Sequence, residues 1–93
     1  MKAVLNNTVL AESDKTVTVE GNHYFPPDSV KMEFLSPTTR QTTCPWKGVA
    51  SYYTINANGT TLENGAWTYP EPKDAAREIT NHVAFYSPVK VEQ

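Results

Sequence analysis

Turn signals recur at short intervals through this sequence, and they limit its fold more than any other feature. They are Asn6-Asn7, Gly21-Asn22, Pro26-Pro27, Asn58-Gly59 and the prolines within residues 70–72. Asparagine and glycine tolerate positive φ in tight hairpin turns, and proline cannot donate to a sheet ladder. Parallel strands need a crossover of roughly a dozen or more residues. Because no segment between the predicted strands is long enough, we expect a mainly antiparallel β fold.

The stretches between these turns have the composition of strands. In residues 16–20 the two valines alternate with polar residues, which is typical of a strand with one solvated face. Tyr52 and Tyr53 are adjacent within another predicted strand, so their side chains must face opposite sides of its sheet. The remaining predicted strands are residues 3–5, 8–11, 30–35, 49–55, 60–62, 66–69, 82–86 and 89–91. We expect a polar loop at residues 36–43, a turn at residues 63–65 and a single short helix at residues 73–80.

The length and charge of the chain restrict it to one domain with one core. Its 93 residues carry a net charge of −2 and contain no cluster of lysine or arginine. We therefore predict a single domain over residues 1–93 that does not bind nucleic acid, because phosphate binding needs a positive surface. No apolar run approaches the ~20 residues of a membrane span, so no membrane partner is expected. The aromatic residues are predicted to supply the core, among them Phe34, Trp46, Tyr53, Trp67 and Phe85.

Cys44 is the only cysteine in the chain. An intramolecular disulfide and a zinc site built mainly on thiolates are therefore impossible, and no metal or cofactor is predicted. Residues 1–7 end in two asparagines and lack the apolar stretch of a signal peptide. These observations favour a reducing, cytoplasmic location.

Several strings in the sequence resemble a known family over nearly the whole chain. They are Tyr24-Phe25-Pro26, Cys44-Pro45-Trp46-Lys47-Gly48, Ser51-Tyr52-Tyr53, Ala66-Trp67-Thr68-Tyr69-Pro70 and Ala84-Phe85-Tyr86. In this order they resemble the bacterial and fungal domain of unknown function 427, which is sometimes labelled nucleotidyltransferase-like. The resemblance implies a β-tent type fold, similar in topology to methionine sulfoxide reductase B. The chain lacks the Cys-x-x-Cys zinc knuckles of many β-tent relatives, and it has no Gly-rich phosphate cradle.

The candidate site centres on Cys44 and Lys47. A lysine close to a thiol can lower the pKa of that thiol, while a buried thiol at the start of a strand is the structural alternative. Lys47 with Glu33 forms a second candidate pair, which could tune a base or hold an anion, or could be a surface ion pair. We assign tentative catalytic roles to Glu33, Cys44 and Lys47. Tyr24, Tyr52 and Trp67 are the predicted ligand-binding residues.

Two functions of different classes follow from these residues. The first is a domain that binds a small molecule in a pocket lined by Glu33, Cys44, Lys47 and Tyr52, with Cys44 or Lys47 supplying any catalytic reactivity. The alternative is a non-catalytic interaction or scaffold module that acts through an exposed strand edge or through residues 36–43. The sequence decides neither whether the chain is an enzyme nor its oligomeric state. A concave pocket with Lys47 and Glu33 pointing into it would favour the first function, whereas a filled interior with a flat apolar edge would favour the second.

Overall fold

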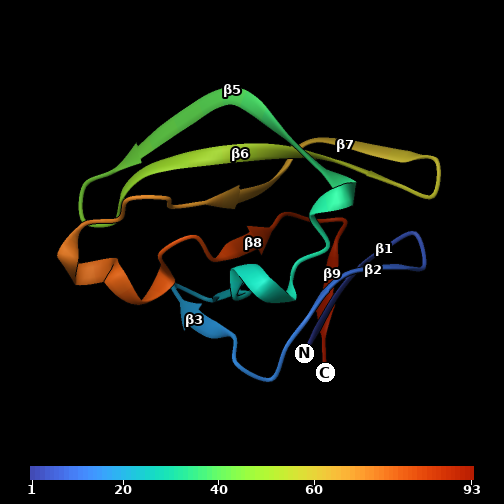
Figure 1. Ribbon diagram of the computed structural model, residues 1–93, viewed down its shortest axis with the longest axis horizontal. Coiled ribbons are helices and arrows are strands. Elements are labelled where there is room, and N and C mark those ends of the chain that lie inside the picture. Colours follow the sequence, from blue (N-terminus) through green and yellow to red (C-terminus); the bar gives the residue numbers. More distant parts are fainter.

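The computed structural model describes residues 1–93 and is built from three antiparallel sheets (Figure 1). Their strand orders are β2-β1-β9, β3-β4 and β5-β6-β7-β8. The strands are β1 (Lys2–Leu5), β2 (Thr8–Glu12), β3 (Val17–Val19), β4 (Asn22–Tyr24), β5 (Leu35–Cys44), β6 (Gly48–Ala57), β7 (Thr60–Thr68), β8 (Val83–Phe85) and β9 (Lys90–Glu92). The prediction of a mainly antiparallel β fold is confirmed. Similarity to methionine sulfoxide reductase B stays a prediction.

Tight turns join the consecutive strands of three hairpins. At each turn both central residues have positive φ, the geometry of the type I′ turn that matches the twist of the flanking strands. The pairs are Asn6-Asn7 (48° and 64°), Glu20-Gly21 (54° and 80°) and Asn58-Gly59 (50° and 80°). The turns expected at Asn6-Asn7 and Asn58-Gly59 are confirmed. The second turn lies one residue before the predicted Gly21-Asn22, and this places Glu20 at its tip.

Two predicted irregular segments are parts of long strands. Residues 36–43 lie within β5, at the edge of the four-stranded sheet, where a threonine-rich strand can be polar because it has few neighbours. Residues 63–65 lie within β7. Both strands bulge where they pair with β6. Residues 37–41 of β5 lie opposite residues 51–53 of β6, so β5 has two extra residues there. Residues 62–66 of β7 lie opposite residues 53–55 of β6, so β7 also has two extra residues. The turn residues at 63–65 therefore accommodate a bulge rather than a chain reversal.

The helical structure of the domain is limited to three short 3-10 helices. They are η1 (Pro27–Ser29), η2 (Met32–Phe34) and η3 (Asp74–Ile79). The strand expected at residues 30–35 is wrong, because its middle forms η2. The short helix expected at residues 73–80 is present as η3, but Ala76 has non-helical φ/ψ angles within it. None of the helices has the length and apolar composition needed to cross a membrane.

The apolar side chains form two clusters, and strand alternation divides neighbouring residues between them. Tyr52 belongs to one cluster, while Tyr53 packs against the other, as the sequence predicts. We call these the aromatic cluster and the N-terminal core. The aromatic cluster contains Tyr24, Ala50, Tyr52, Trp67, Tyr69, Ala76, Ile79 and Ala84. The N-terminal core contains Ala3, Leu5, Leu10, Ala11, Phe25, Val30, Leu35, Ile55, Ala57, Ala66, Val83, Phe85 and Val89.

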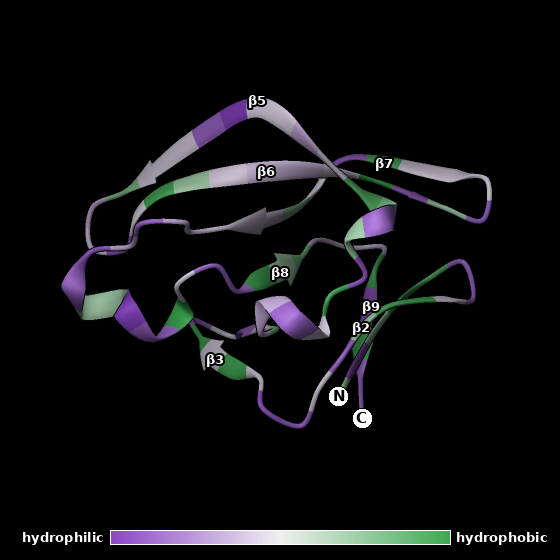
Figure 2. Cartoon of the chain, in the orientation of Figure 1, coloured by the Kyte–Doolittle hydropathy of each residue, from purple (hydrophilic) through white to green (hydrophobic).

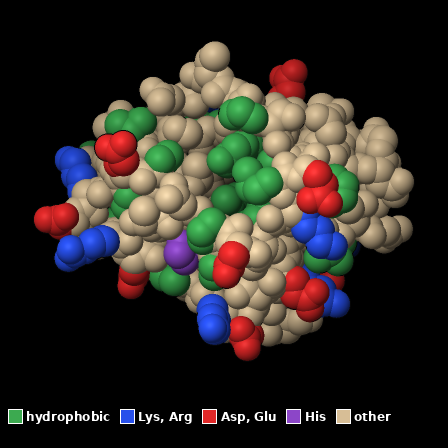
Figure 3. All heavy atoms as spheres, viewed as in Figure 1, with side chains coloured by type: hydrophobic (Ala, Val, Ile, Leu, Met, Phe, Trp, Pro, Cys, Tyr) green, Lys and Arg blue, Asp and Glu red, His purple; other side chains and the backbone are tan.

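The predicted aromatic core is correct in four of its five members. Trp67 and Phe85 are buried, and Phe34 and Tyr53 pack against the N-terminal core. The exception is Trp46, which lies in the turn between β5 and β6 and is 39% exposed. Figure 2 shows the apolar strands β3 and β8 beneath the long strands of the four-stranded sheet. The middle of β5, at the outer edge of that sheet, is hydrophilic. On the face shown in Figure 3, hydrophobic side chains gather in a strip near the middle, and charged ones lie on both sides of it and below it.

Candidate functional site

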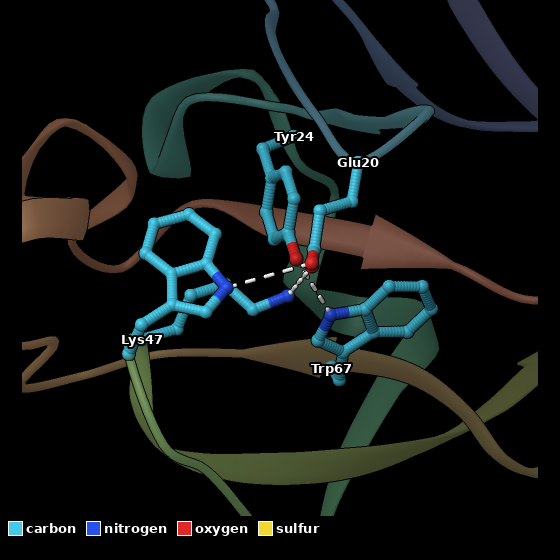
Figure 4. Close-up of polar contacts among 5 residues, drawn as sticks. Glu20, Tyr24, Lys47 and Trp67 are labelled. Atoms are coloured by element: carbon cyan, nitrogen blue, oxygen red, sulfur yellow. Dashed lines mark hydrogen bonds and ion pairs between the residues drawn. The ribbon is translucent and has the colours of Figure 1, made fainter.

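Lys47 is a buried cation in the turn between β5 and β6. Only 7% of the residue is exposed, although lysine is almost never fully buried unless it is paired. Its Nζ atom bonds to Oε1 of Glu20 and lies 5.5 Å from the ring centroids of both Trp46 and Tyr69. Figure 4 shows the Lys47 side chain directed to the Glu20 carboxylate, with Tyr24 and Trp67 close by. The ammonium is therefore held by one ion pair and two cation–π contacts.

The partner carboxylate comes from the tip of the β3–β4 hairpin. Glu20 has a side chain that is 53% exposed, in contrast to the buried lysine. Its second oxygen, Oε2, accepts a hydrogen bond from Nε1 of Trp46 at 3.4 Å. The two oxygens of one carboxylate are thus bound by the consecutive residues Trp46 and Lys47.

Buried aromatic residues form the wall behind this ion pair. Tyr24 is fully buried, and its hydroxyl accepts a hydrogen bond of 3.1 Å from Nε1 of Trp67. The Tyr24 ring also lies 6.5 Å from the ring of Tyr69. The surroundings of Lys47 are consequently apolar apart from a few fixed hydrogen-bonding groups. We refer to Glu20, Tyr24, Trp46, Lys47 and Tyr69 as the Lys47 site.

Electrostatic effects keep both members of the ion pair charged. The hydrogen bond from Lys47 is the main cause that lowers the pKa of Glu20, and it outweighs desolvation. Burial alone would lower the pKa of Lys47, but the bond to Glu20 and the nearby hydroxyls of Tyr24 and Tyr69 raise that pKa overall. Lys47 is thus a permanent cation at neutral pH. It is suited to holding an anion and unsuited to acting as a base.

A second polar group lies at the exposed end of the aromatic cluster. The Tyr52 hydroxyl is hydrogen bonded to Oγ1 of Thr42 at 2.8 Å, and the Arg40 guanidinium lies 5.1 Å from the centre of the Tyr52 ring. Burial favours a higher pKa for Tyr52, but the hydrogen bond with Thr42 and the nearby Tyr86 and Arg40 lower this pKa overall. Burial, with the neighbouring Tyr52, raises the pKa of Tyr86 to about 12. The two neighbouring phenols thus have pKa values shifted in opposite directions.

The structure brings some of the predicted site residues together and separates others. Tyr24, Tyr52 and Trp67 all belong to the aromatic cluster, and half-buried Cys44 packs against it. The predicted pairing of Lys47 with Glu33 is wrong: Glu33 is exposed in η2, and the carboxylate on Lys47 is that of Glu20. The expected alternation of residues 30–35 placed Glu33 on a strand that does not form.

Sequence reasoning missed Glu20 and the polar contact of Trp46. Glu20 lies 27 positions before Lys47, so no local spacing could indicate the pair. The available signal was a carboxylate directly before Gly21 at a strand end. That signal identifies a turn residue, and it does not identify what the turn contacts.

Two surface hollows are present, and neither is lined by the predicted site residues. The larger, about 380 Å³, is lined by Gln41, Val49, Ser51, Pro70 and Glu71. The smaller, about 310 Å³, is lined by Thr38, Thr39, Arg40, Thr54, Glu63 and Asn64, beside the two bulges. We call the larger the Glu71 hollow and the smaller the bulge hollow. The pocket predicted around Lys47 is filled by aromatic side chains and Glu20, and no group of three or more His, Cys, Asp or Glu side chains could hold a metal ion.

These features define a small antiparallel β domain with a buried lysine–glutamate pair against an aromatic cluster. The family model described as a domain of unknown function (DUF427) matches residues 1–93, so the chain belongs to this family. No curated protein matches the chain.

Proposed function

We propose that this domain binds a small carboxylate-bearing molecule at the Lys47 site, with the ligand taking the place of the Glu20 side chain. One observation carries the proposal. The buried Lys47 ammonium and the Trp46 indole N–H both bind one carboxylate, and that carboxylate belongs to a half-exposed residue at a hairpin tip. A ligand carboxylate offers the same two acceptor oxygens to the same two donors.

The hairpin that carries Glu20 is anchored at its β4 end, and its tip is half-exposed. Its strands β3 and β4 have three residues each and form a sheet of two strands only. Directly after β4, Phe25 exchanges two backbone hydrogen bonds with Val83, and Tyr24 is fully buried, so this end of the hairpin is fixed. Movement is therefore confined to the tip, where the Glu20 side chain is 53% exposed. Withdrawal of Glu20 would open a space between Trp46, Tyr69 and Tyr24. Those rings would then contact the apolar part of the ligand.

The raised pKa of Lys47 supports binding rather than proton transfer as its role. Cys44 packs against the same aromatic cluster, so its thiol is the nearest candidate for any reaction on a bound ligand. A cytoplasmic location is part of this proposal, because a domain with one cysteine needs no disulfide. The alternative of an interaction module is less well supported: the free edge strand β5 is interrupted by Pro37 and by its bulge, features that oppose edge-to-edge pairing.

The proposal is tested by replacing Glu20 and supplying a carboxylate in solution. Glu20→Ala leaves the ammonium without its anion, so acetate, propionate or benzoate should raise the Tm of this variant above its value in chloride at equal ionic strength. The same salts should raise the Tm of wild type less. Glu33→Ala, which removes an exposed carboxylate that forms no salt bridge, is the matched control and should respond as wild type does.

The double variant Glu20→Ala/Lys47→Met separates a specific effect from a general one. It lacks both charges and should lose the gain in Tm that carboxylates give to Glu20→Ala. Equal gains in Glu20→Ala, Glu33→Ala and the double variant would overturn the proposal. So would the absence of any gain in Glu20→Ala.

A further inference from the structure

We call the four-stranded sheet β5-β6-β7-β8 the central sheet. The Glu71 hollow lies on the opposite face of this sheet from the Lys47 site. Val49 and Ser51 line it, whereas Ala50 and Tyr52, which alternate with them along β6, point into the aromatic cluster. Its volume of about 380 Å³ is at the lower end of the range known for small-molecule sites. The hollow is therefore separate from the proposed carboxylate site.

The wall that carries Glu71 is held firmly against the start of β6. The backbone N–H of Lys73 donates to the carbonyl of Lys47 at 2.9 Å, and the Lys73 ammonium donates to the carbonyl of Pro45 at 2.7 Å. Prolines at positions 70 and 72 restrict the backbone on both sides of Glu71. A side chain at position 48 would meet this wall, because an added Cβ would lie 3.4 Å from the Glu71 carbonyl oxygen. The hollow is thus preformed.

The charge in the hollow is a single carboxylate without a partner. Glu71 forms no salt bridge, since the ion pair of this protein is Lys47–Glu20 and the Lys73 ammonium is directed to Pro45. The other lining side chains are neutral: Gln41 and Ser51 offer hydrogen bonds, and Val49 and Pro70 offer apolar surface. Val49 is 44% exposed, which is unusual for a valine in a central strand.

Next to the hollow, the buried Thr68 hydroxyl forms no hydrogen bond. Thr68 pairs directly with Ser51 across the β6–β7 ladder, so the two side chains lie on the same face. Thr68 is 5% exposed, and its Oγ1 atom has no hydrogen-bond partner. A buried hydroxyl without a partner is costly and rare in native proteins.

We infer that the Glu71 hollow binds a small primary ammonium compound with a short apolar stem. The ammonium group pairs with the Glu71 carboxylate, and the stem lies on Val49 and Pro70. Gln41 and Ser51 accept the remaining N–H groups of the ligand. This site takes a cation, whereas the proposed Lys47 site takes an anion.

The test is a titration of the ¹⁵N-labelled protein with n-butylammonium chloride, followed by amide chemical shifts. We expect saturable shifts at Gln41, Val49, Ser51 and Glu71, and none with 1-butanol, the neutral molecule of similar shape. Glu71→Gln keeps the shape of the side chain and removes its charge, so it should weaken binding about three- to fivefold. Glu63→Gln, which alters an exposed carboxylate in the bulge hollow, should bind as wild type does.

Three outcomes would overturn the inference. They are the absence of saturable shifts around the hollow, equal binding of 1-butanol, and equal affinity in Glu71→Gln. Binding by Glu20→Ala/Lys47→Met should equal that of wild type, so this result does not depend on the function of the Lys47 site.

Discussion

Trp67 and Tyr24 are joined by a hydrogen bond inside the aromatic cluster, although they lie 43 positions apart in the chain. The indole Nε1 donates to the phenol oxygen at 3.1 Å, and the two rings meet at 90° with their centroids 6.1 Å apart. This contact ties β4 of the small hairpin to β7 of the central sheet. It holds the hairpin against that sheet, while Glu20 at its tip remains half-exposed.

Tyr24→Phe should destabilise the domain, because it removes the acceptor of the Trp67 N–H and keeps the ring. A buried donor left without a partner costs about 1–3 kcal/mol in the free energy of unfolding. Urea denaturation measures this loss. Tyr53→Phe is the control, since Tyr53 packs against the N-terminal core and takes no part in this bond, and it should change the free energy by less than about 0.5 kcal/mol. Equal effects of the two substitutions would contradict the role given to the bond.

The sequence predicted the features of this fold that depend on neighbouring residues. Asn6-Asn7 and Asn58-Gly59 form the expected turns because their preference for positive φ is local. Tyr52 and Tyr53 face different clusters because alternation along a strand is geometric. The loop predicted at residues 36–43 is wrong, because a polar edge strand and a polar loop have the same composition. Only the neighbouring strand β6 distinguishes them.

The sequence indicated the lysine and the aromatic residues of the candidate site, and it did not indicate the carboxylate partner of the lysine. Lys47, Tyr24, Tyr52 and Trp67 stood out by residue type and by family resemblance, and the structure brings Tyr24, Tyr52 and Trp67 into one cluster near Lys47. The partner of Lys47 depends on how the β3–β4 hairpin folds onto the central sheet. That arrangement is tertiary, so the choice between Glu20 and Glu33 could not be made from spacing.

The two members of the ion pair should respond differently to substitution. Glu20→Gln leaves a buried ammonium without a countercharge, whereas Lys47→Met leaves a carboxylate that water already reaches. Methionine can also fill the space among Trp46 and Tyr69. We therefore expect Glu20→Gln to lower the Tm more than Lys47→Met does, with Glu33→Gln as a neutral control. The reverse order in differential scanning calorimetry would show that the ammonium is not the buried partner.

Acid should weaken the domain through Glu20. The pKa of this carboxyl is lowered in the folded state from its ordinary value of 4.5, so its contribution to stability is complete above 4.5 and is lost as the pH falls through the lower folded value. The difference in unfolding free energy between wild type and Glu20→Gln should be constant near neutral pH and should shrink below about pH 4.5.

At alkaline pH, the contribution of the ion pair to stability is limited by the titration of Lys47. Its pKa is raised in the folded state, so its contribution is complete below the ordinary value of 10.5 and is lost as the pH rises through the higher folded value. Urea titrations of wild type and Glu20→Gln across these pH ranges measure both limits. A difference that grows toward acid would contradict the lowered pKa of Glu20.

Thr68→Val should stabilise the domain, which is unusual for a substitution at a buried polar residue. The Thr68 hydroxyl is buried without a hydrogen-bond partner, so a methyl group of similar size removes a desolvation cost of about 1 kcal/mol without opening a cavity. Thr42→Val is the matched control, because the Thr42 hydroxyl is bonded to Tyr52 at 2.8 Å and its loss should cost about 1 kcal/mol. Opposite changes in the urea midpoint of the two variants are expected. A loss of stability in Thr68→Val as large as that in Thr42→Val would mean that the Thr68 hydroxyl has a partner in solution, such as a bound water.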